Sequence, residues 1–336
     1  MPAPLLEIRD YSLAIDSFDG TLQVLDHIDL AVGRGEAVGI VGETGCGKSV
    51  TVKSVLGLMP SPPARVESGS VTFDGADLTA AEAAAIRHIR GREIAMIFQD
   101  PMTYLNPLFT VGQQLIDVIK AKQRLAPAAE RLDRRAIREK AAALLRQVHL
   151  PNPESQLDNY PHQLSGGMRQ RILIAMALAG SPKLLIADEP TTALDVTIQA
   201  QILDLVRELV EKLGMALIMI SHDLGVVAAV CQRILVMYAG VIVEDAPVER
   251  LFESPKHPYT QGLLAAIPRL DGSATSLASI PGAIPNLIHP PGGCRFHPRC
   301  PQAMARCGSE KPAMRAVGAG QVAACHLYDV DDAASA

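Results

Sequence analysis

Glycines, a lysine and a serine occur in a spacing that suits binding of a phosphate group. The string GIVGETGCGKSV places Gly42, Gly47, Lys48 and Ser49 in the order G-x-x-x-x-G-K-[ST]. Glycines let backbone N–H groups wrap phosphates, the lysine reaches the β- and γ-phosphates, and the serine hydroxyl binds Mg²⁺. A chance glycine turn is the weaker alternative, because an apolar run precedes the string and a helical pattern follows it. The predicted phosphate-binding loop, or P-loop, consists of Gly42, Glu43, Thr44, Gly45, Cys46, Gly47, Lys48, Ser49 and Val50.

A second string, LLIADEP, ends an apolar run with two carboxylates, Asp188 and Glu189. Asp188 stands where a carboxylate would hold Mg²⁺, directly or through water. Glu189 would face the γ-phosphate and orient and polarise the attacking water. The alternative is a pair of surface acids at a strand end. No N-K-x-D string follows, so the sequence gives no support to a GTPase.

Four cysteines lie close together in the last part of the chain. Cys294, Cys300, Cys307 and Cys325 have the spacing C-x₅-C-x₆-C-x₁₇-C. Seven of thirteen residues in the preceding string PGAIPNLIHPPGG are Pro or Gly, which indicates irregular backbone. Four thiolates suit structural Zn²⁺ or a [4Fe–4S] cluster, and this spacing does not choose between them. The alternative is four unrelated thiols in a loop.

Alternating short apolar runs and longer helical patterns must position these groups. The buried strands are expected at 36–42, 94–99, 183–188, 216–221 and 233–238, with a helix at 198–214. This alternation predicts an α/β domain around a mainly parallel sheet. The strings LLEIRDYSLAID and GSVTFDGADL predict antiparallel strands at its edge. From about Pro101 to Leu164 the pattern is helical and charged.

Composition limits the classes of function. The 336 residues are 48% apolar and carry a formal net charge of −5, which gives no case for nucleic acid as the main partner. The first residues do not resemble a secretory signal, and no run of eighteen apolar residues occurs. The expected compartment is the cytosol, where thiols stay reduced and a cysteine cluster favours metal binding over disulfides.

The string LSGGMRQR, with Ser165 placed 23 residues before Asp188, completes an ordered set of motifs. P-loop, LSGG and ADEP in this order resemble the ATP-binding-cassette (ABC) ATPases. The resemblance implies that Gln99 contacts Mg²⁺ and senses the γ-phosphate, that Ala193, Leu194 and Asp195 form the D-loop, and that His222 is the switch histidine. It also implies a head-to-tail pair of ATPase units, with ATP held between the P-loop of one and Ser165, Gly166 and Gly167 of the other. Ser49 and Gln99 are the expected Mg²⁺ ligands.

Finer strings narrow the resemblance. FQDPMTYLNPLFTVGQQL, HPYTQGLLAAIPRLDG and GCRFHPRC are similar to ATPase subunits of dipeptide, oligopeptide and nickel importers. This resemblance implies two membrane permeases, an extracytoplasmic solute-binding protein and a second related ATPase subunit, in a heterodimer or a homodimer. The chain would then lie peripherally at the cytoplasmic face of the inner membrane. Its cargo would be di- or oligopeptides, with nickel or another non-peptide solute as the alternative. Members with this tail motif include iron–sulfur proteins, so [4Fe–4S] is expected, with Zn²⁺ second.

The predicted fold is therefore α/β, that of an ABC-type P-loop NTPase with an antiparallel β edge. Residues 1–100 and 165–255 form the expected nucleotide-binding core. Residues 101–164 form an inserted helical subdomain, and residues 256–336 form a C-terminal extension with a cysteine-ligated metal site. Two other classes compete: a soluble ABC protein of DNA repair or translation, and a metal-binding regulator without ATPase activity. One cassette, a short insertion and intact Glu189 and His222 weigh against both.

Three positions depart from the pattern of the family. Cys46 replaces a small polar residue, and at a helix N-terminus its thiolate would be favoured and sensitive to alkylation. The alternative is a tolerated spacer. Tyr104 replaces a serine. The residue that stacks on adenine is expected near Ile15, with Tyr11 and Phe18 as the aromatic candidates.

Overall fold

The computed structural model describes residues 3–99, 101–124, 131–192, 194–267 and 279–329. The chain forms two compact units. Unit 1 includes Val32–Ala37 and Ala80–Ile220, and unit 2 comprises Pro4–Ala31, Val38–Thr79 and Ser221–Ala336. The three-part division expected from the sequence stays a prediction.

Unit 1 contains the parallel strands that carry the predicted carboxylates. Strands β6 (Ile94–Ile97), β7 (Leu184–Asp188) and β8 (Ala216–Ser221) lie in the order β8-β7-β6. Leu184 pairs with Ile94 on one side and with Ala216 on the other. Every residue of β7 and β8 is buried, as expected for parallel strands covered on both faces. The apolar runs at 94–99, 183–188 and 216–221 therefore form strands as predicted.

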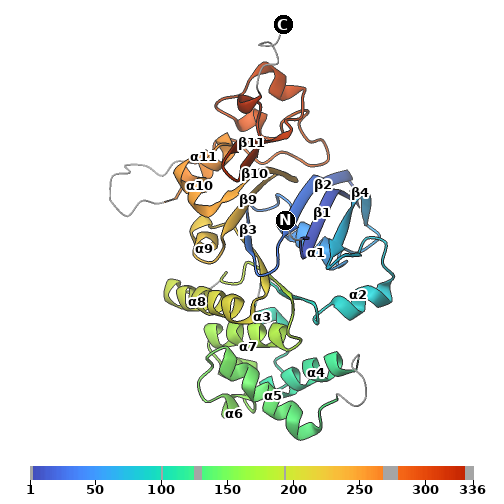
Figure 1. The fold of residues 1–336 in the computed structure, drawn as a ribbon, viewed down its shortest axis with the longest axis vertical. Helices are drawn as coiled ribbons and strands as arrows, with labels where there is room; N and C mark the ends of the chain where they lie inside the picture. The colour runs from blue at the N-terminus through green and yellow to red at the C-terminus, as the bar shows by residue number, and fades with distance from the viewer. Residues whose placement is uncertain (1–2, 100, 125–130, 193, 268–278, 330–336) are drawn as a thin grey trace. The chain divides into compact units, whose positions relative to one another are not determined.

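The rest of unit 1 is helical. Between residues 101 and 164 the described residues form helices and no strand, as the sequence predicts. Helix α5 buries Ile137, Ala141, Leu144 and Leu145 on one stripe, whereas its arginines face solvent. Figure 1 shows α4 and α5 stacked with α7. The helices are α2 (Ala83–Ile89), α3 (Pro101–Tyr104), α4 (Val111–Gln123), α5 (Arg134–Gln147), α6 (Pro153–Gln156), α7 (Gly166–Leu178) and α8 (Val196–Leu213).

Unit 2 contains the predicted antiparallel edge as a four-stranded sheet (Figure 1). Its order is β2-β1-β4-β5, formed by β1 (Leu6–Ser17), β2 (Gly20–Val32), β4 (Ala64–Phe73) and β5 (Ala76–Asp77). Strands β1 and β4 pair from Leu6 opposite Phe73 to Ile15 opposite Ala64. The sequence predicted β1 and β4 but not β2.

A second group of strands in unit 2 runs in the order β11-β12-β10-β9-β3. Strand β3 (Ala37–Val41) is parallel to β9 (Arg233–Tyr238), and β10 (Val241–Pro247) follows antiparallel to β9. The hairpin of β11 (Met314–Gly318) and β12 (Gln321–Ala324) then pairs with β10. The extension is therefore not irregular throughout, because its last part adds two strands to the sheet. The unit's helices are α1 (Lys48–Val55), α9 (Leu224–Ala228), α10 (Val248–Glu253) and α11 (Pro258–Ala265).

A buried carboxylate joins the start of the extension to these strands. Glu244 of β10 is fully buried and accepts hydrogen bonds from the backbone N–H groups of Lys256 and His257 and from Nε2 of Gln321, each at 2.8 Å. Three donors compensate the charge that burial would otherwise penalise. Burial lowers the pKa of the neighbouring His257 to about 3, so its ring is neutral. Neutral Nδ1 accepts the N–H of Tyr259 at the start of α11.

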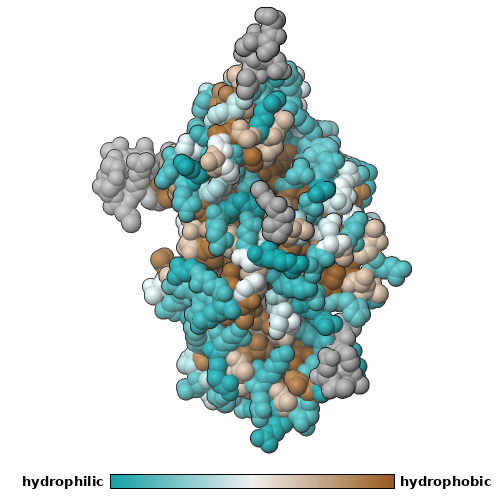
Figure 2. Space-filling view, viewed as in Figure 1, coloured by the Kyte–Doolittle hydropathy of each residue, from teal (hydrophilic) through white to brown (hydrophobic). Residues whose placement is uncertain are grey.

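Among the described residues, no helix has the length and apolar character needed to cross a membrane. On the face drawn in Figure 2, hydrophilic side chains predominate and hydrophobic ones lie between them in small groups. Exposed large hydrophobic side chains in unit 1 include Leu108, Phe109 and Val196.

Candidate nucleotide site

The P-loop follows β3 and leads into α1, as the sequence predicts. Gly42, Gly45 and Gly47 have positive φ angles of 153°, 84° and 108°. A Cβ on Gly42 would lie 2.1 Å from the carbonyl oxygen of Met237, so close packing as well as the backbone angle requires glycine there. A Cβ on Gly45 would meet no atom within 4 Å, so this part of the loop borders open space. The loop is thus closely packed at Gly42 and open at Gly45, as a loop that binds phosphates through its backbone requires.

Lys48, the first residue of α1, points back into the loop. Its side chain is buried, and Nζ donates to the carbonyl oxygens of Gly42 at 2.7 Å and Glu43 at 3.0 Å. Nζ also lies 3.8 Å from Sγ of Cys46. The ammonium group is therefore held inside the loop, where it can contact a bound phosphate.

Cys46 is buried in the base of the loop. Burial raises the pKa of this thiol, although Lys48 acts in the opposite direction. The neutral thiol is therefore the favoured form. This finding supports the interpretation of Cys46 as a tolerated spacer and weakens the expectation of a reactive thiolate.

Glu43 carries contacts that the sequence analysis missed. The phenol oxygen of Tyr259 accepts the N–H of Glu43 at 2.9 Å, and the guanidinium of Arg299 binds the Glu43 carboxylate with two N–O distances of 2.7 and 3.0 Å. Both partners come from the extension, more than 200 positions along the chain. No local pattern in the sequence indicates these pairs, because neither partner belongs to the P-loop motif.

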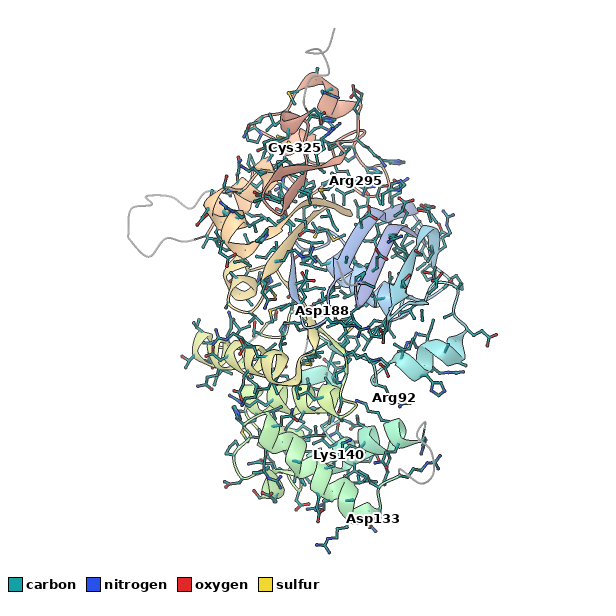
Figure 3. All side chains as sticks on the ribbon, viewed as in Figure 1. Arg92, Asp133, Lys140, Asp188, Arg295 and Cys325 are labelled. Carbon is teal, nitrogen blue, oxygen red and sulfur yellow. The ribbon has the colours of Figure 1, made fainter. Side chains whose placement is uncertain are left out.

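In unit 1, the two predicted carboxylates stand at the end of β7. Asp188, labelled in Figure 3, is the last residue of the strand and is 3% exposed. Glu189 has a φ of 49°, which is uncommon for a residue with a Cβ, and its N–H donates to the carbonyl oxygen of Ile220. The backbone therefore turns directly after the strand, between Asp188, which ends β7, and Glu189, which follows it.

The Glu189 carboxylate is held by two neighbouring side chains. Nε2 of Gln99 donates to Oε2 of Glu189 at 2.8 Å, and Oγ1 of Thr192 donates to the same oxygen at 2.9 Å. The structure thus brings together Gln99 and Glu189, which lie 90 positions apart in the sequence. Thr192 is a further contact that the sequence analysis did not identify.

The predicted signature and D-loop residues begin two helices of unit 1. Ser165 is the N-cap of α7, and its Oγ accepts the N–H of Met168. Asp195 is the N-cap of α8, and its carboxylate accepts the N–H of Ile198. A Cβ on Gly167 would lie 2.6 Å from Ile198, so this glycine lets the two helices pack closely. Leu194 precedes the second cap, and Ala193 lies outside the described residues.

The remaining candidates belong to unit 2. His222 follows β8 and is exposed. Of the three positions considered for adenine stacking, Tyr11 is buried at 4% exposure, Ile15 is half-buried, and Phe18 is fully exposed. A buried Tyr11 belongs to the core, so Phe18 is the aromatic candidate that a ligand can reach.

The four tail cysteines form no disulfide; three of them lie at short 3-10 helices, and Cys294 lies at a bend before the first of these. Cys300 follows η3 (His297–Arg299), Cys307 lies in η4 (Ala305–Gly308) and Cys325 precedes η5 (His326–Tyr328). The N–H of Cys294 donates to the carbonyl of Cys307 at 2.8 Å. Figure 3 labels Cys325, together with Arg295 from the same extension.

The four thiols lie near one another, but their arrangement is not that of a site for a single metal ion. Burial, with smaller effects from Cys307, Cys325 and Cys300, raises the pKa of Cys294 to about 11. Among the residues that the structure describes, no three His, Cys, Asp or Glu side chains are arranged to hold a metal ion. The cysteine-ligated metal site is therefore not confirmed.

Comparison with known proteins agrees with the geometry of the loop and the strand ends. A family model described as "ABC transporter" matches residues 25–192, and one described as "Oligopeptide/dipeptide transporter, C-terminal region" matches residues 243–307. The dipeptide transport ATP-binding protein DppD of Escherichia coli (strain K12) is 48% identical over 98% of both chains.

The chain belongs to the ABC transporter family. As an ABC ATPase, it couples ATP hydrolysis to transport. The oligopeptide transport ATP-binding protein AppD of Bacillus subtilis (strain 168) is a further relative, 43% identical over 98% of both chains.

Solved ABC structures confirm the fold. The ABC cassette MJ0796, solved as a dimer in a post-hydrolysis state with ADP and Pi, is 26% identical with a TM-score of 0.63. The alignment covers 72% of this chain and 98% of that one. CbiO1 of Clostridium perfringens, part of the ABC transporter complex CbiONQ, is 28% identical with a TM-score of 0.62, over 75% of this chain and 92% of that one. The predicted α/β ABC fold is therefore correct.

Proposed function

We propose that this ABC ATPase powers the import of di- or oligopeptides across the cytoplasmic membrane. The observation that carries the proposal is the match to dipeptide and oligopeptide transport proteins over nearly the whole chain, extension included. The proposed partners are two membrane permeases, an extracytoplasmic solute-binding protein and a second ATPase subunit. In this assembly the chain lies peripherally on the cytoplasmic face of the membrane.

The proposed residue roles are those that the motifs and the ABC resemblance imply, and contacts within each unit support several of them. The P-loop amides and Lys48 would hold the phosphates. Ser49 and Gln99 would be ligands of the Mg²⁺ ion, and Asp188 would hold it directly or through water. Glu189, held by Gln99 and Thr192, orients the water that attacks the γ-phosphorus while the bond to the β–γ bridging oxygen breaks. His222 contacts the γ-phosphate.

The helix caps at α7 and α8 suggest how a second subunit takes part. Ser165, Gly166 and Gly167 present a hydroxyl and helix N-terminal amides, which suit an anion. We assign them, with Asp195, to the ATP held by the partner ATPase subunit. ATP then joins the two subunits, and its hydrolysis releases them.

Reconstituted transport tests the peptide proposal. The chain is co-expressed with its cognate permeases and second ATPase, placed in proteoliposomes, and supplied with binding protein and a radiolabelled dipeptide. ATP-dependent uptake of the dipeptide is expected. The Lys48→Ala variant is expected to lose the part of this uptake that depends on ATP bound by this subunit. Uptake of Ni²⁺ without peptide uptake would select the alternative cargo, and uptake of neither would contradict an importer for these solutes.

For the cysteine tail we propose a [4Fe–4S] cluster, with Zn²⁺ as the second candidate. Four reduced thiols at turns within one segment support a shared ligand. A single Zn²⁺ ion requires sulfurs about 3.8 Å apart, as Zn–S bonds of about 2.3 Å dictate, whereas a four-iron cluster separates them further. The ligand would clamp a Pro/Gly-rich segment.

Anaerobic purification distinguishes these ligands. The cluster predicts brown protein with visible absorption that bleaches on reduction, and loss of iron in the Cys300→Ser variant. The Cys231→Ser variant is the control, because Cys231 is a buried thiol outside the tail. Colourless protein with stoichiometric zinc would select Zn²⁺, and metal-free protein would refute both.

A further inference from the structure

Glu43 is the one acidic residue within the P-loop, and it stands where a polyanion is expected to bind. An uncompensated carboxylate there would repel the phosphates of ATP. Its charge is matched by Arg299, whose Nη1 lies 2.7 Å from Oε2 and whose Nη2 lies 3.0 Å from Oε1. The two parallel contacts form a bidentate pair, which fixes direction as well as charge.

The pair is sheltered from water. The side chain of Arg299 is 5% exposed and that of Glu43 is 27% exposed. The guanidinium of an arginine stays charged in proteins. Solvent screens such a pair less than it screens an exposed one.

A second residue of the extension fixes the backbone of Glu43. The hydroxyl of Tyr259 accepts the Glu43 N–H, and burial raises the pKa of this phenol, so it stays neutral. The Tyr259 ring is fully buried and packs edge-on against Tyr238, with centroids 4.6 Å apart. Since Lys48 takes the Glu43 carbonyl, the N–H, the carboxylate and the carbonyl of this residue are all held.

Arg299 is itself fixed within the extension. Its Nε donates to the carbonyl of Pro281 at 2.9 Å, and Nη2 donates to the carbonyl of Ile280 at 3.2 Å. It ends η3, directly before Cys300, and its own N–H bonds to the carbonyl of Phe296. The cysteine-bearing turn therefore sets the position of the guanidinium.

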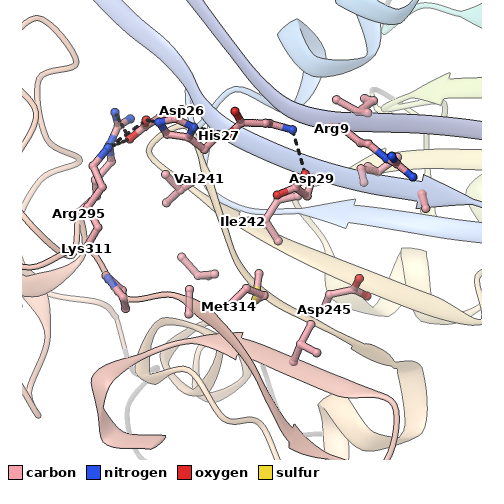
Figure 4. Close-up of a pocket in the computed structure, with 18 of the residues that line it drawn as sticks. Arg9, Asp26, His27, Asp29, Val241, Ile242, Asp245, Arg295, Lys311 and Met314 are labelled. Carbon is pink, nitrogen blue, oxygen red and sulfur yellow. Dashed lines mark hydrogen bonds and ion pairs between the residues drawn. The ribbon is translucent and has the colours of Figure 1, made fainter. Parts of the chain in front are cut away.

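The same segment has a second anchor at Arg295. Its guanidinium bonds to the carbonyl of Ala239 and to Asp26, which also binds Lys311. These charged groups line a cavity of about 770 Å³, in which Arg295 and Lys311 converge on Asp26 (Figure 4). Two arginines four positions apart thus fasten the turn to the rest of unit 2.

We propose that Arg299 is a positioning residue for ATP: it neutralises Glu43 and, with Tyr259, preorganises the P-loop, so that nucleotide affinity depends on the C-terminal extension. A glycine-rich loop loses conformational freedom when it binds a ligand, and anchoring one of its residues beforehand reduces that cost. This inference rests on the proposed phosphate-binding role of the P-loop. It adds a dependence that the P-loop motif does not contain.

Binding of Mg-ATP and Mg-ADP to the full chain, measured by isothermal titration calorimetry, tests the proposal. Arg299→Ala is expected to raise the Kd for Mg-ATP about tenfold, because a charged Glu43 remains beside the phosphates. Adding Glu43→Gln to this variant should bring the Kd back to within about threefold of the parent, since the repelling charge is gone. Arg299→Lys should weaken binding less than Arg299→Ala, because it keeps the charge and loses the fork.

Two further variants separate positioning from general stability. Tyr259→Phe keeps the buried ring and removes one hydrogen bond, and it is expected to raise the Kd about three- to fivefold. Arg315→Ala removes an arginine of the extension that pairs with Asp329, and it should leave the Kd unchanged. A parental Kd in both Arg299→Ala and Tyr259→Phe, or a loss in Arg299→Ala that Glu43→Gln does not relieve, would overturn the inference. Absence of nucleotide binding by the parent chain would overturn the proposed function as well.

Discussion

The P-loop and the C-terminal extension both determine the surroundings of Glu43, but they do so over different distances along the chain. Lys48 reaches the Glu43 carbonyl from five positions away. Tyr259 and Arg299 reach its N–H and its carboxylate from 216 and 256 positions away. The geometry of the P-loop follows from its own glycines, whereas the contacts of the extension depend on the tertiary packing of unit 2.

The proposed dependence of ATP affinity on the extension therefore involves residues outside the P-loop motif. The contacts that Lys48 makes with Gly42 and Glu43 involve the P-loop alone. The contacts to Tyr259 and Arg299 come from residues that follow α10 in the chain. Variants of the core should therefore affect chemistry, whereas variants of the extension should affect affinity and stability.

The largest effect is expected from Glu189→Gln in the core. The substitution keeps the shape of the side chain and removes the charge that we propose orients water, so ATP hydrolysis should fall at least about a hundredfold. Binding of Mg-ATP should persist, and the closed ATP-bound dimer should accumulate. Phosphate release and size-exclusion chromatography measure these outcomes. Glu139→Gln, at an exposed position on α5, is the control, and near-normal turnover in Glu189→Gln would remove this residue from the mechanism.

Ser165→Arg should have the next largest effect. If α7 completes the site of a partner subunit, the bulky cation hampers closure, and ATPase activity falls about tenfold or more while the Kd for ATP stays near the parental value. Asp133→Ala removes the N-cap of α5 and controls for loss of a helix cap alone. Complete loss of ATP binding by the Ser165→Arg subunit would argue that the residue belongs to its own P-loop site.

Glu244→Gln tests how the extension is attached to β10, and its expected effect is on stability. An amide NH₂ replaces one acceptor oxygen, so a buried N–H donor loses its partner, at a cost of about 2 kcal/mol in the free energy of unfolding. Chemical denaturation measures the loss, and limited proteolysis should cut the extension sooner. Glu249→Gln, at an exposed position of α10, is the matched control. Equal stability of Glu244→Gln and the parent would show that the three hydrogen bonds to Glu244 do not fasten the extension.

The smallest effect is expected from Cys46→Ser. Burial raises the pKa of the thiol, so it is a neutral spacer, and serine should leave the Kd for Mg-ATP within about twofold. Iodoacetamide at neutral pH should modify Cys46 slowly in the folded chain, as mass spectrometry can measure. Rapid alkylation that ATP prevents would restore the interpretation of Cys46 as a reactive thiol.

The site was predictable wherever a function is encoded in contiguous residues. Gly42 to Gly47 form a loop because closely spaced glycines precede α1, and Asp188 ends a strand, with Glu189 directly after it, because an apolar run stops there. The family resemblance assigned Gln99 a role at the γ-phosphate, but the hydrogen bond between Gln99 and Glu189 was not predicted. The hairpin β11–β12 was missed because its short strands carry little apolar periodicity and gain their stability from pairing with β10.

The order of the motifs along the sequence determined the ABC family. Local patterns determined the P-loop and the strand-end carboxylates. These features depend on residues within about one turn of each other, where backbone sterics and local hydrogen bonds decide the structure. Only the tertiary structure decided that Arg299 and Tyr259 hold Glu43, that Glu244 fastens the extension, and that Tyr11 is buried whereas Phe18 is exposed. Such contacts join segments that lie far apart in the sequence and meet only in the folded sheet. A local sequence pattern does not indicate which distant side chain will contact it.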